Sequence, residues 1–346
     1  MRVVFRVDAS LQMGTGHVMR CLTLALVLKE NGVDVRFICR KHKGNLIDKI
    51  RSNGFNVHEL ELLVEIEVDN RLAHSQWLGA TQQQDADDCI NILKVEKTNW
   101  IIVDHYALDE QWQKRIKLYC KKLMVIDDLA DRKHQCDVLL DQTFGRQQKD
   151  YLALTPEGCE LLLGSQYALL RSEFSKLIKK ALEKRKNTQE VKNILISIGG
   201  GDIVNITYDI LKSIKNTYNI TVVLGGKSPH KKMLKSYTKN KNTTVMIDAE
   251  NMAELMLNAD LAIGSGGSSS WERCCLGLPT LLYITADNQK TIAENLERIG
   301  AVKIVKDLKK NLQTMSTDFS LWKAMSKKSI TITDGLGVYR VAKHIE

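Results

Sequence analysis

Short, almost continuously apolar runs recur along this chain, and each leads through a polar or glycine-containing turn into a helix-like segment. The run Trp100–Val103 is one example, because it has no charged or hydroxyl side chain on either face. Such runs are typical of strands whose two faces are both covered by helices. Their regular alternation with helices predicts an α/β fold built on doubly wound parallel sheets.

The alternation runs through the first half of the chain, is interrupted by a polar, lysine-rich stretch, and restarts at Asn193. We therefore predict a Rossmann-like domain over 1–170, a junction over 171–190 and a second Rossmann-like domain over 191–346, with the final helix free to pack on the first domain. Two such domains facing a cleft would bind ligands at the carboxyl ends of their strands. The segment Glu61–Gln84 fits least well and is expected to be an irregular insertion.

The predicted elements follow the apolar pattern. In the first half, strands are expected at 3–7, 33–39, 55–60, 100–105, 123–127 and 138–141, and helices at 17–30, 45–52, 86–97 and 110–120. In the second half, strands are expected at 194–198, 221–224, 244–247, 261–263 and 280–284, and helices from about 203 and at 251–259, 269–276 and 289–299.

Composition excludes several classes of protein. The 346 residues are 44% hydrophobic and 26% charged, as in a soluble globular protein. The net charge of +9 comes largely from lysine runs without nucleic-acid motifs or interleaved aromatic residues, so we expect solvated helix faces and no nucleic-acid partner. No signal peptide and no transmembrane segment are evident, which predicts a cytoplasmic protein. The eight cysteines form no C-x-x-C pair, and no metal-ligand cluster is visible.

The first glycine-rich turn, SLQMGTGHVMR, follows the N-terminal strand and leads into a helix. Gly14 and Gly16 let the backbone approach a ligand, and the helix start favours an anion. His17 stands at that start and is the only side chain in the stretch that titrates near neutral pH. The same pattern also fits a structural turn with a surface histidine.

The second glycine-rich turn, GSGGSSSWE at Gly264–Glu272, follows an apolar strand and also opens a helix. Gly266 and Gly267 free the backbone, and the hydroxyls and N–H groups of Ser268, Ser269 and Ser270 suit a diphosphate. Glu272 could accept hydrogen bonds from both hydroxyls of a ribose. The spacing is neither that of a P-loop nor that of the dinucleotide fingerprint. A serine-rich helix cap is the alternative.

Three further strand ends carry polar groups. Tyr106 could hydrogen-bond a ligand or be a strand-end aromatic residue. Asn288 and Gln289 could hold sugar hydroxyls or N-acetyl groups, although the tripeptide around them also fits a helix cap. Asp127 and Asp128 fit either a like-charge pair with one raised pKa or a turn.

Taken together, four stretches resemble the UDP-2,4-diacetamido-2,4,6-trideoxy-β-L-altropyranose hydrolase family of pseudaminic acid biosynthesis. They are FRVDASLQMGTGHVMRC, IIVDHY, the run from IDAENMAELM through ADLAIGSGGSSSWERCCLGLPTLL to ADNQ, and the closing DGLGVYRVAKHI. The second half is also similar, more distantly, to the glycosyltransferase that adds N-acetylglucosamine to lipid I. The resemblance implies the two-domain glycosyltransferase B fold.

The resemblance also implies roles for single residues. His17 becomes the catalytic base for an inverting C–O cleavage that releases UDP and free sugar. Tyr106 and Asn288 correspond to the sugar end of the site and Glu272 to the ribose carboxylate. The backbone of Ile247 would meet the uracil. The diphosphate loop comprises Gly267, Ser268 and Ser269.

Because no metal-ligand cluster is visible in the sequence, we expect no required metal, and we expect no cofactor. The implied partners are a UDP-linked diacetamido-trideoxy sugar as substrate and, beyond it, enzymes of the same pathway. Two other functions fit the residues: a glycosyltransferase of the same fold that uses an alcohol acceptor, and a nucleotide-sugar-binding protein without catalysis. Release of free sugar without an added acceptor would distinguish a hydrolase from both of these alternatives.

Overall fold

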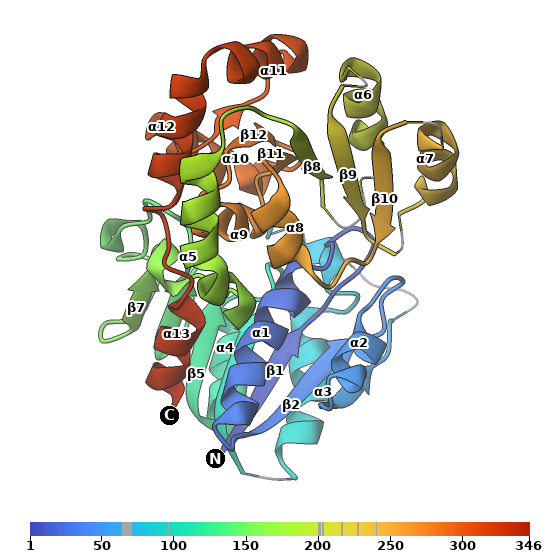
Figure 1. Cartoon of the computed structure of the whole chain (residues 1–346). Helices are drawn as coiled ribbons and strands as arrows, with labels where there is room; N and C mark the ends of the chain where they lie inside the picture. The colour runs from blue at the N-terminus through green and yellow to red at the C-terminus, as the bar shows by residue number, and fades with distance from the viewer. Residues whose placement is uncertain are drawn as a thin grey trace. The chain divides into compact units, whose positions relative to one another are not determined.

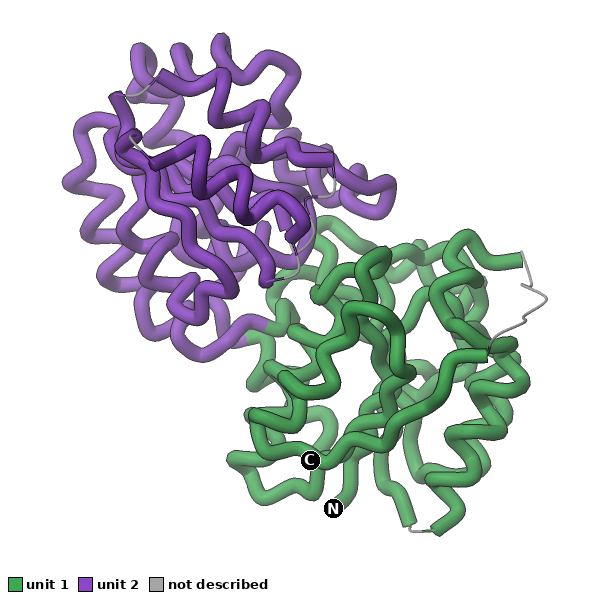
Figure 2. The backbone as a smooth tube through the Cα atoms, turned by 90° about the vertical axis from the view of Figure 1, so that its right-hand side faces the viewer, with its two compact units in different colours: residues 1–169, 337–346 green, residues 170–336 purple. Residues whose placement is uncertain are grey.

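The computed structural model describes residues 1–63, 71–95, 97–199, 202, 204–215, 217–226, 228–239 and 241–346. The chain divides into two compact units, which Figure 2 shows in different colours. Unit 1 comprises 1–169 and 337–346, and unit 2 comprises 170–336. Each unit is a parallel sheet covered by helices, as the apolar pattern predicts.

Unit 1 contains a seven-stranded sheet in the order β3-β2-β1-β4-β5-β6-β7, with every neighbouring pair parallel. Its strands are β1 (Arg2–Val7), β2 (Asp34–Arg40), β3 (Asn56–Leu60), β4 (Thr98–Asp104), β5 (Cys120–Ile126), β6 (Val138–Asp141) and β7 (Glu160–Leu163). This order reverses direction between β1 and β4, the place where doubly wound sheets bind ligands.

The helices of unit 1 pack on both faces of this sheet. They are α1 (Gly16–Glu30), α2 (Ile47–Ser52), α3 (Gln82–Leu93), α4 (Glu110–Ile116) and α13 (Gly337–Ile345), with short 3₁₀ turns η1 (Ser75–Trp77), η2 (Lys117–Tyr119), η3 (Gln148–Asp150) and η4 (Ser165–Tyr167). Alternate residues of one strand enter different cores: Ile102 packs with Leu24 of α1, and Ile101 packs with Trp112 of α4. This explains why the strand is apolar throughout.

Helix α13 returns to unit 1 after the whole of unit 2 and packs beside α1, as Figure 1 shows in red and blue. Val338, Val341 and Ile345 are buried in the same core as Leu24. Gly337 lies so close to the backbone of Ala168 that an added Cβ would come within 2.4 Å of its carbonyl oxygen. The glycine is therefore required by close packing.

Unit 2 contains a six-stranded parallel sheet in the order β10-β9-β8-β11-β12-β13. Its strands are β8 (Asn193–Ser197), β9 (Asn219–Leu224), β10 (Thr243–Ile247), β11 (Leu261–Ser265), β12 (Thr280–Tyr283) and β13 (Lys303–Ile304). Its helices are α5 (Ser172–Asn187), α6 (Ile206–Ser213), α7 (Lys231–Thr238), α8 (Met252–Asn258), α9 (Ser269–Cys275), α10 (Lys290–Arg298), α11 (Leu308–Thr317) and α12 (Phe319–Ser329), with 3₁₀ turn η5 (Asp287–Gln289).

The expected junction at 171–190 lies within unit 2, where most of it forms α5. Phe174 and Ala181 are fully buried, and Arg185 donates to the carbonyl oxygens of Met256 and Ala259 at 2.8 and 2.5 Å. Basic residues that the sequence assigns to a solvated face thus partly point inward. A buried arginine that satisfies helix-end carbonyls is well compensated.

Several elements differ from the prediction. Strands β7 and β13 and helices α5, α7, α11 and α12 are absent from it. Part of the expected insertion at Glu61–Gln84 and the expected start of a helix at about 203 lie outside the described residues. Within the described part of the chain, no helix has both the length and the apolar character needed to span a bilayer.

Candidate active site

His17 and Asp104 meet at the carboxyl ends of β1 and β4, where the order of the sheet reverses. His17 is the second residue of α1, which follows β1. Asp104 is the last residue of β4 and is fully buried. Residues 87 positions apart in sequence therefore become partners because β1 and β4 are neighbours in the sheet.

The contact determines which nitrogen of His17 carries a hydrogen. His17 Nδ1 lies 2.6 Å from Asp104 Oδ1. Burial by itself raises the pKa of Asp104, but the charges of Arg20 and His17 outweigh it and hold the pKa well below the ordinary value. The acid is therefore ionised, and Nδ1 must be the donor. Nε2 has no hydrogen-bond partner among the described residues, and whenever the ring is neutral it is Nε2 that bears the lone pair a general base requires.

Arg20 fixes the other side of this carboxylate. Its Nε donates to Asp104 Oδ2 at 2.6 Å and its Nη2 to Asp104 Oδ1 at 2.7 Å. Its Nη1 donates to Asp128 Oδ2 at 2.8 Å. Because all three side chains are mostly buried, the pairing holds Asp104 in one orientation toward His17.

Aromatic rings adjoin His17. Tyr106 packs edge-on against it, with ring centroids 4.6 Å apart, and its hydroxyl donates to Asp128. His74, which precedes η1, and Trp77, its last residue, pack on Tyr106 with ring centroids 5.3 and 5.8 Å away. We call Tyr106, His74 and Trp77 the aromatic cluster. Burial lowers the pKa of His74, which favours its neutral ring.

The glycines of the first turn serve different ends. Gly14 has a φ of +76° and donates its N–H to the Ser10 carbonyl oxygen at 2.9 Å, so it adopts a conformation that other residues rarely take. Gly16 is the first residue of α1. The turn therefore ends where α1 begins, and His17 lies in the first turn of that helix. The alternative of a surface histidine is wrong, because His17 is only 8% exposed.

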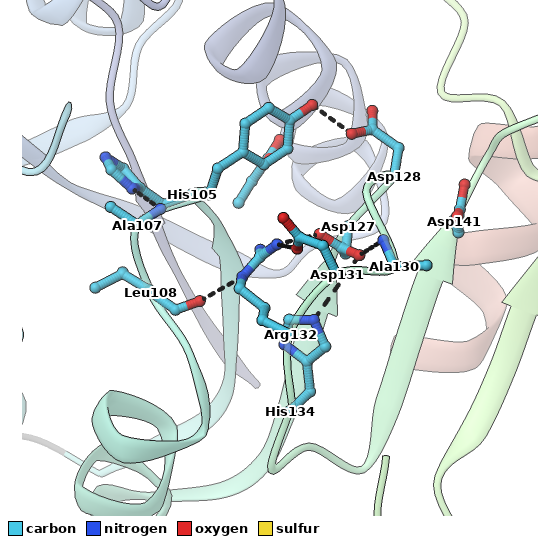
Figure 3. Close-up of polar contacts among 12 residues, drawn as sticks. His105, Ala107, Leu108, Asp127, Asp128, Ala130, Asp131, Arg132, His134 and Asp141 are labelled. Carbon is cyan, nitrogen blue, oxygen red and sulfur yellow. Dashed lines mark hydrogen bonds and ion pairs between the residues drawn. The ribbon is translucent and has the colours of Figure 1, made fainter. Parts of the chain in front are cut away.

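The acids Asp127 and Asp128 do not form a like-charge pair. Burial raises the pKa of Asp127, but Arg132 and His134 outweigh it and hold the pKa well below the ordinary value. Figure 3 shows Arg132 beside Asp127 and the N–H of Ala130 donating to the same carboxylate. Asp128 faces away toward Arg20, so the turn interpretation fits Asp127.

A different acid has a raised pKa. Burial raises the pKa of Asp141 to about 6, against the opposing charge of Arg146. The Tyr151 hydroxyl lies 2.8 Å from carboxylate oxygens of both Asp141 and Asp127. One hydroxyl hydrogen can serve only one of the two carboxylates at a time.

In unit 2, the second glycine-rich turn joins β11 to α9, again where the strand order reverses, between β8 and β11. Ser268 is the N-cap residue but makes no side-chain capping bond, so a serine cap does not explain the motif. The hydroxyls of Ser269 and Ser270 accept from Arg273 at 3.0 and 3.1 Å. An added Cβ at Gly267 would meet no atom within 4 Å, so its surroundings are open.

Glu272 lies in the first turn of α9 with a partly exposed side chain. The ion pair it forms within the described residues joins its Oε1 to Arg171 Nη2 at 3.9 Å, a loose contact. Burial raises the pKa of Glu272, and the charges of Arg171 and Arg273 oppose the shift. Its oxygens are weakly engaged and suited to accept ligand hydroxyls.

The remaining predicted residues of unit 2 lie on neighbouring strand ends. Gln289 Oε1 accepts from the backbone N–H groups of Gly266 and Thr285 at 3.2 and 3.0 Å, so this side chain joins two loops. Asn288 is half-buried in η5. Ile247 ends β10 and packs against the core of the unit.

Sequence reasoning missed Asp104, Arg20, His74 and Trp77 in unit 1 and Arg273 in unit 2. Asp104 had a usable signal, because a buried acid that ends a central strand next to β1 must find a partner at that edge. His74 and Trp77 had no such signal, since they lie in the irregular insertion.

The chain is similar in sequence to a known family domain and to known proteins. Residues 161–333 match the glycosyltransferase family 28 C-terminal domain. The chain is 31% identical over 302 residues to UDP-2,4-diacetamido-2,4,6-trideoxy-β-L-altropyranose hydrolase of Campylobacter jejuni, covering 87% of this chain and 97% of that protein. It is 30% identical over 299 residues to an uncharacterised protein of Methanocaldococcus jannaschii, covering 84% of this chain but 57% of that protein. The chain thus spans little more than half the length of the archaeal relative.

The fold is shared with solved glycosyltransferases. The structure of MurG from Acinetobacter baumannii superposes with a TM-score of 0.68 at 16% identity, covering 99% of each chain. The predicted fold class, two doubly wound α/β units of the glycosyltransferase B type, is confirmed.

Proposed function

Because the chain belongs to the UDP-2,4-diacetamido-2,4,6-trideoxy-β-L-altropyranose hydrolase family, we propose that it is a UDP-sugar-processing enzyme that hydrolyses this nucleotide sugar. Water attacks the anomeric carbon, the bond from that carbon to the phosphate oxygen breaks, and UDP leaves with the bonding electrons. The observation that carries the proposal is the His17–Asp104 pair, which places the hydrogen of the neutral ring on Nδ1 and so assigns the lone pair to Nε2 of a nearly buried histidine.

Unit 1 supplies the groups that act on the sugar. His17 Nε2 takes a proton from the attacking water, and Asp104 stabilises the imidazolium that forms. The aromatic cluster offers an apolar surface beside this base, which suits the methyl and acetyl groups of a diacetamido-trideoxy sugar. The same surface keeps bulk water away from the reacting carbon.

Unit 2 holds the UDP. Glu272 accepts from the ribose hydroxyls, the backbone of Ile247 meets the uracil, and Ser268 and Ser269 donate to the diphosphate. Asn288 and the side-chain Nε2 of Gln289 contact the sugar. Donors at the diphosphate stabilise the charge that develops as UDP departs, so no strong general acid is required.

The proposal is tested by incubating the protein with the UDP-sugar in H₂¹⁸O without an acceptor, followed by NMR and mass spectrometry of the products. We expect free sugar of inverted anomeric configuration carrying ¹⁸O, with unlabelled UDP. Label in the UDP would place the cleavage at phosphorus. No turnover with retained UDP binding would indicate a binding protein.

A glycosyltransferase is the second candidate, because residues 161–333 match a glycosyltransferase domain and the fold is shared with MurG. It would transfer the sugar to an alcohol in place of water. A transferase would consume the UDP-sugar slowly without an acceptor and rapidly with one, so addition of a panel of alcohols distinguishes the two activities.

Replacing Glu272 with Ala is expected to weaken UDP binding about 10- to 150-fold, because two ribose hydroxyls lose a charged acceptor worth roughly 1.5–3 kcal/mol. Calorimetry with UDP measures the change. Glu173→Ala is the matched control, since Glu173 lies 3.1 Å from the same Arg171 but outside the turn. Equal UDP affinities in both variants would refute the role of Glu272.

Replacing Trp77 with Ala is expected to raise KM for the UDP-sugar roughly 3- to 10-fold, because an aromatic packing surface worth about 0.5–1.5 kcal/mol is lost. UDP affinity, which depends on unit 2, should not change. Steady-state kinetics and calorimetry separate the two quantities. Trp77→Phe should retain most of the affinity, and equal losses in both variants would contradict a packing role.

A further inference from the structure

Arg273 is a buried cation beneath the second glycine-rich turn. It extends from α9 and is 2% exposed. Its Nη2 donates to the carbonyl oxygen of Ser265 at 2.6 Å and to Ser270 Oγ at 3.1 Å, and its Nη1 donates to Ser269 Oγ at 3.0 Å. Its Nε is buried without a hydrogen-bond partner among the described residues. The guanidinium is therefore bound entirely by the turn itself.

The charge of Arg273 lacks a direct counterion within the described part of the chain. The buried arginines of unit 1 differ: Arg6 lies 2.6 Å from Asp85, and Arg20 lies 2.6 Å from Asp104. Burial lowers the pKa of Arg273 to about 10. A buried charge without a partner destabilises the fold, and such charges are normally paired or bind a ligand of opposite sign.

The glycine that starts the turn makes room for this arginine. An added Cβ on Gly264 would lie 2.6 Å from Arg273 Nη1 and 3.0 Å from its Cζ. Any larger residue would push the guanidinium away from the serines. The position of the Arg273 guanidinium therefore depends on the absence of a side chain at Gly264.

The hydrogen bonds also fix how the serines can meet a ligand. Ser269 Oγ accepts from Arg273, so its hydroxyl hydrogen is left to donate to a different acceptor. The described residues provide no acceptor for it, which leaves this hydrogen for a ligand. A hydroxyl that accepts from a cation is a stronger donor. The arrangement turns a neutral hydroxyl into a donor suited to an anionic oxygen.

We propose that Arg273 is a positioning residue for the diphosphate of a nucleoside diphosphate: it orients and polarises Ser269 and supplies the positive charge that the bound anion neutralises. The inference rests on the proposed function, which assigns UDP to this turn. Arg273 acts through the serines and the field of its charge, not by contact with the phosphate.

The test compares ligands that share uridine but differ in phosphate charge. Affinities of UDP and, by competition, uridine are measured by calorimetry for the wild type, Arg273→Gln, Arg273→Lys, Ser269→Ala and the Arg273→Gln/Ser269→Ala double variant. We expect Arg273→Gln to weaken UDP binding at least about 10-fold while uridine affinity changes less than about twofold. Arg273→Lys should recover part of the loss, since it keeps the charge.

The double variant separates positioning from general structure. If Arg273 acts through Ser269, then Ser269→Ala should weaken UDP binding in the wild type and have little further effect in Arg273→Gln. Equal losses for UDP and uridine, or additive losses in the double variant, would overturn the inference. If Arg273→Gln does not fold, Arg273→Lys and Ser269→Ala still give the UDP-to-uridine ratio. Failure of the wild type to bind UDP would instead refute the proposed function.

Discussion

Replacing His17 with Asn is expected to lower kcat by about 10²–10⁴ with little change in KM, because general-base catalysis is lost while the shape of the side chain is largely kept. The Asn amide can still contact Asp104 but cannot take a proton from water. Steady-state kinetics on the UDP-sugar, together with UDP calorimetry as a check on unit 2, measure the effect.

If His17→Asn kept a near-normal kcat and lost only affinity, His17 would be a binding group and the base would lie elsewhere. The sequence suggests Asp8, Asp127 and Asp128 for that role. The structure narrows the choice, since the side chains of Asp8 and Asp127 are fully buried and ion-paired. The side chain of Asp128 is 14% exposed, so Asp128→Asn would be the next variant to assay.

Replacing Asp104 with Asn is expected to lower kcat by about 10²–10⁴ as well, although Asp104 itself does not contact the substrate. An Asn amide can donate to His17 Nδ1, which stabilises the tautomer with the hydrogen on Nε2 and removes the lone pair that acts as base. The pH profile should change together with kcat, because the imidazolium loses its counterion. UDP affinity should stay constant.

Asp128→Asn is the matched control for Asp104→Asn. Both variants remove a carboxylate that accepts from Arg20, but Asp128 makes no contact with His17. Thermal melting shows how far each substitution destabilises the buried network. The positioning role predicts that Asp104→Asn loses at least about ten times more kcat than Asp128→Asn, and equal losses would favour a purely structural role.

The strands were the most predictable part of the fold, since a strand buried on both faces must be apolar at every position. Trp100–Val103 illustrates this, with successive residues in opposite cores. Short edge strands such as β13, with two partly exposed residues, carry no such pattern. The helix within segment 171–190 was not predicted, because its lysines mask a narrow apolar face around Phe174 and Ala181.

Residues of the candidate site could be predicted only where the signal for them lies within one local segment. His17 follows its glycines, and Glu272 follows its serines, within single turns. Asp104 becomes the partner of His17 only through the pairing of β1 with β4, a contact between distant segments. The same applies to Trp77, whose position on Tyr106 depends on tertiary packing. Arg273 lies next to Glu272, but the sequence alone does not show that the side chain of this helical arginine is buried.

The return of α13 to unit 1 has a consequence for biosynthesis. A ribosome makes unit 2 as one uninterrupted segment, 170–336, which can fold as soon as it has emerged. Unit 1 cannot complete its core before unit 2 is made, because its last segment is translated after all of unit 2. That segment contains Val338, Val341 and Ile345, which cover α1. During that interval, part of the apolar surface of α1 stays exposed to solvent and to chaperones. The second unit in sequence can therefore be completed before the first.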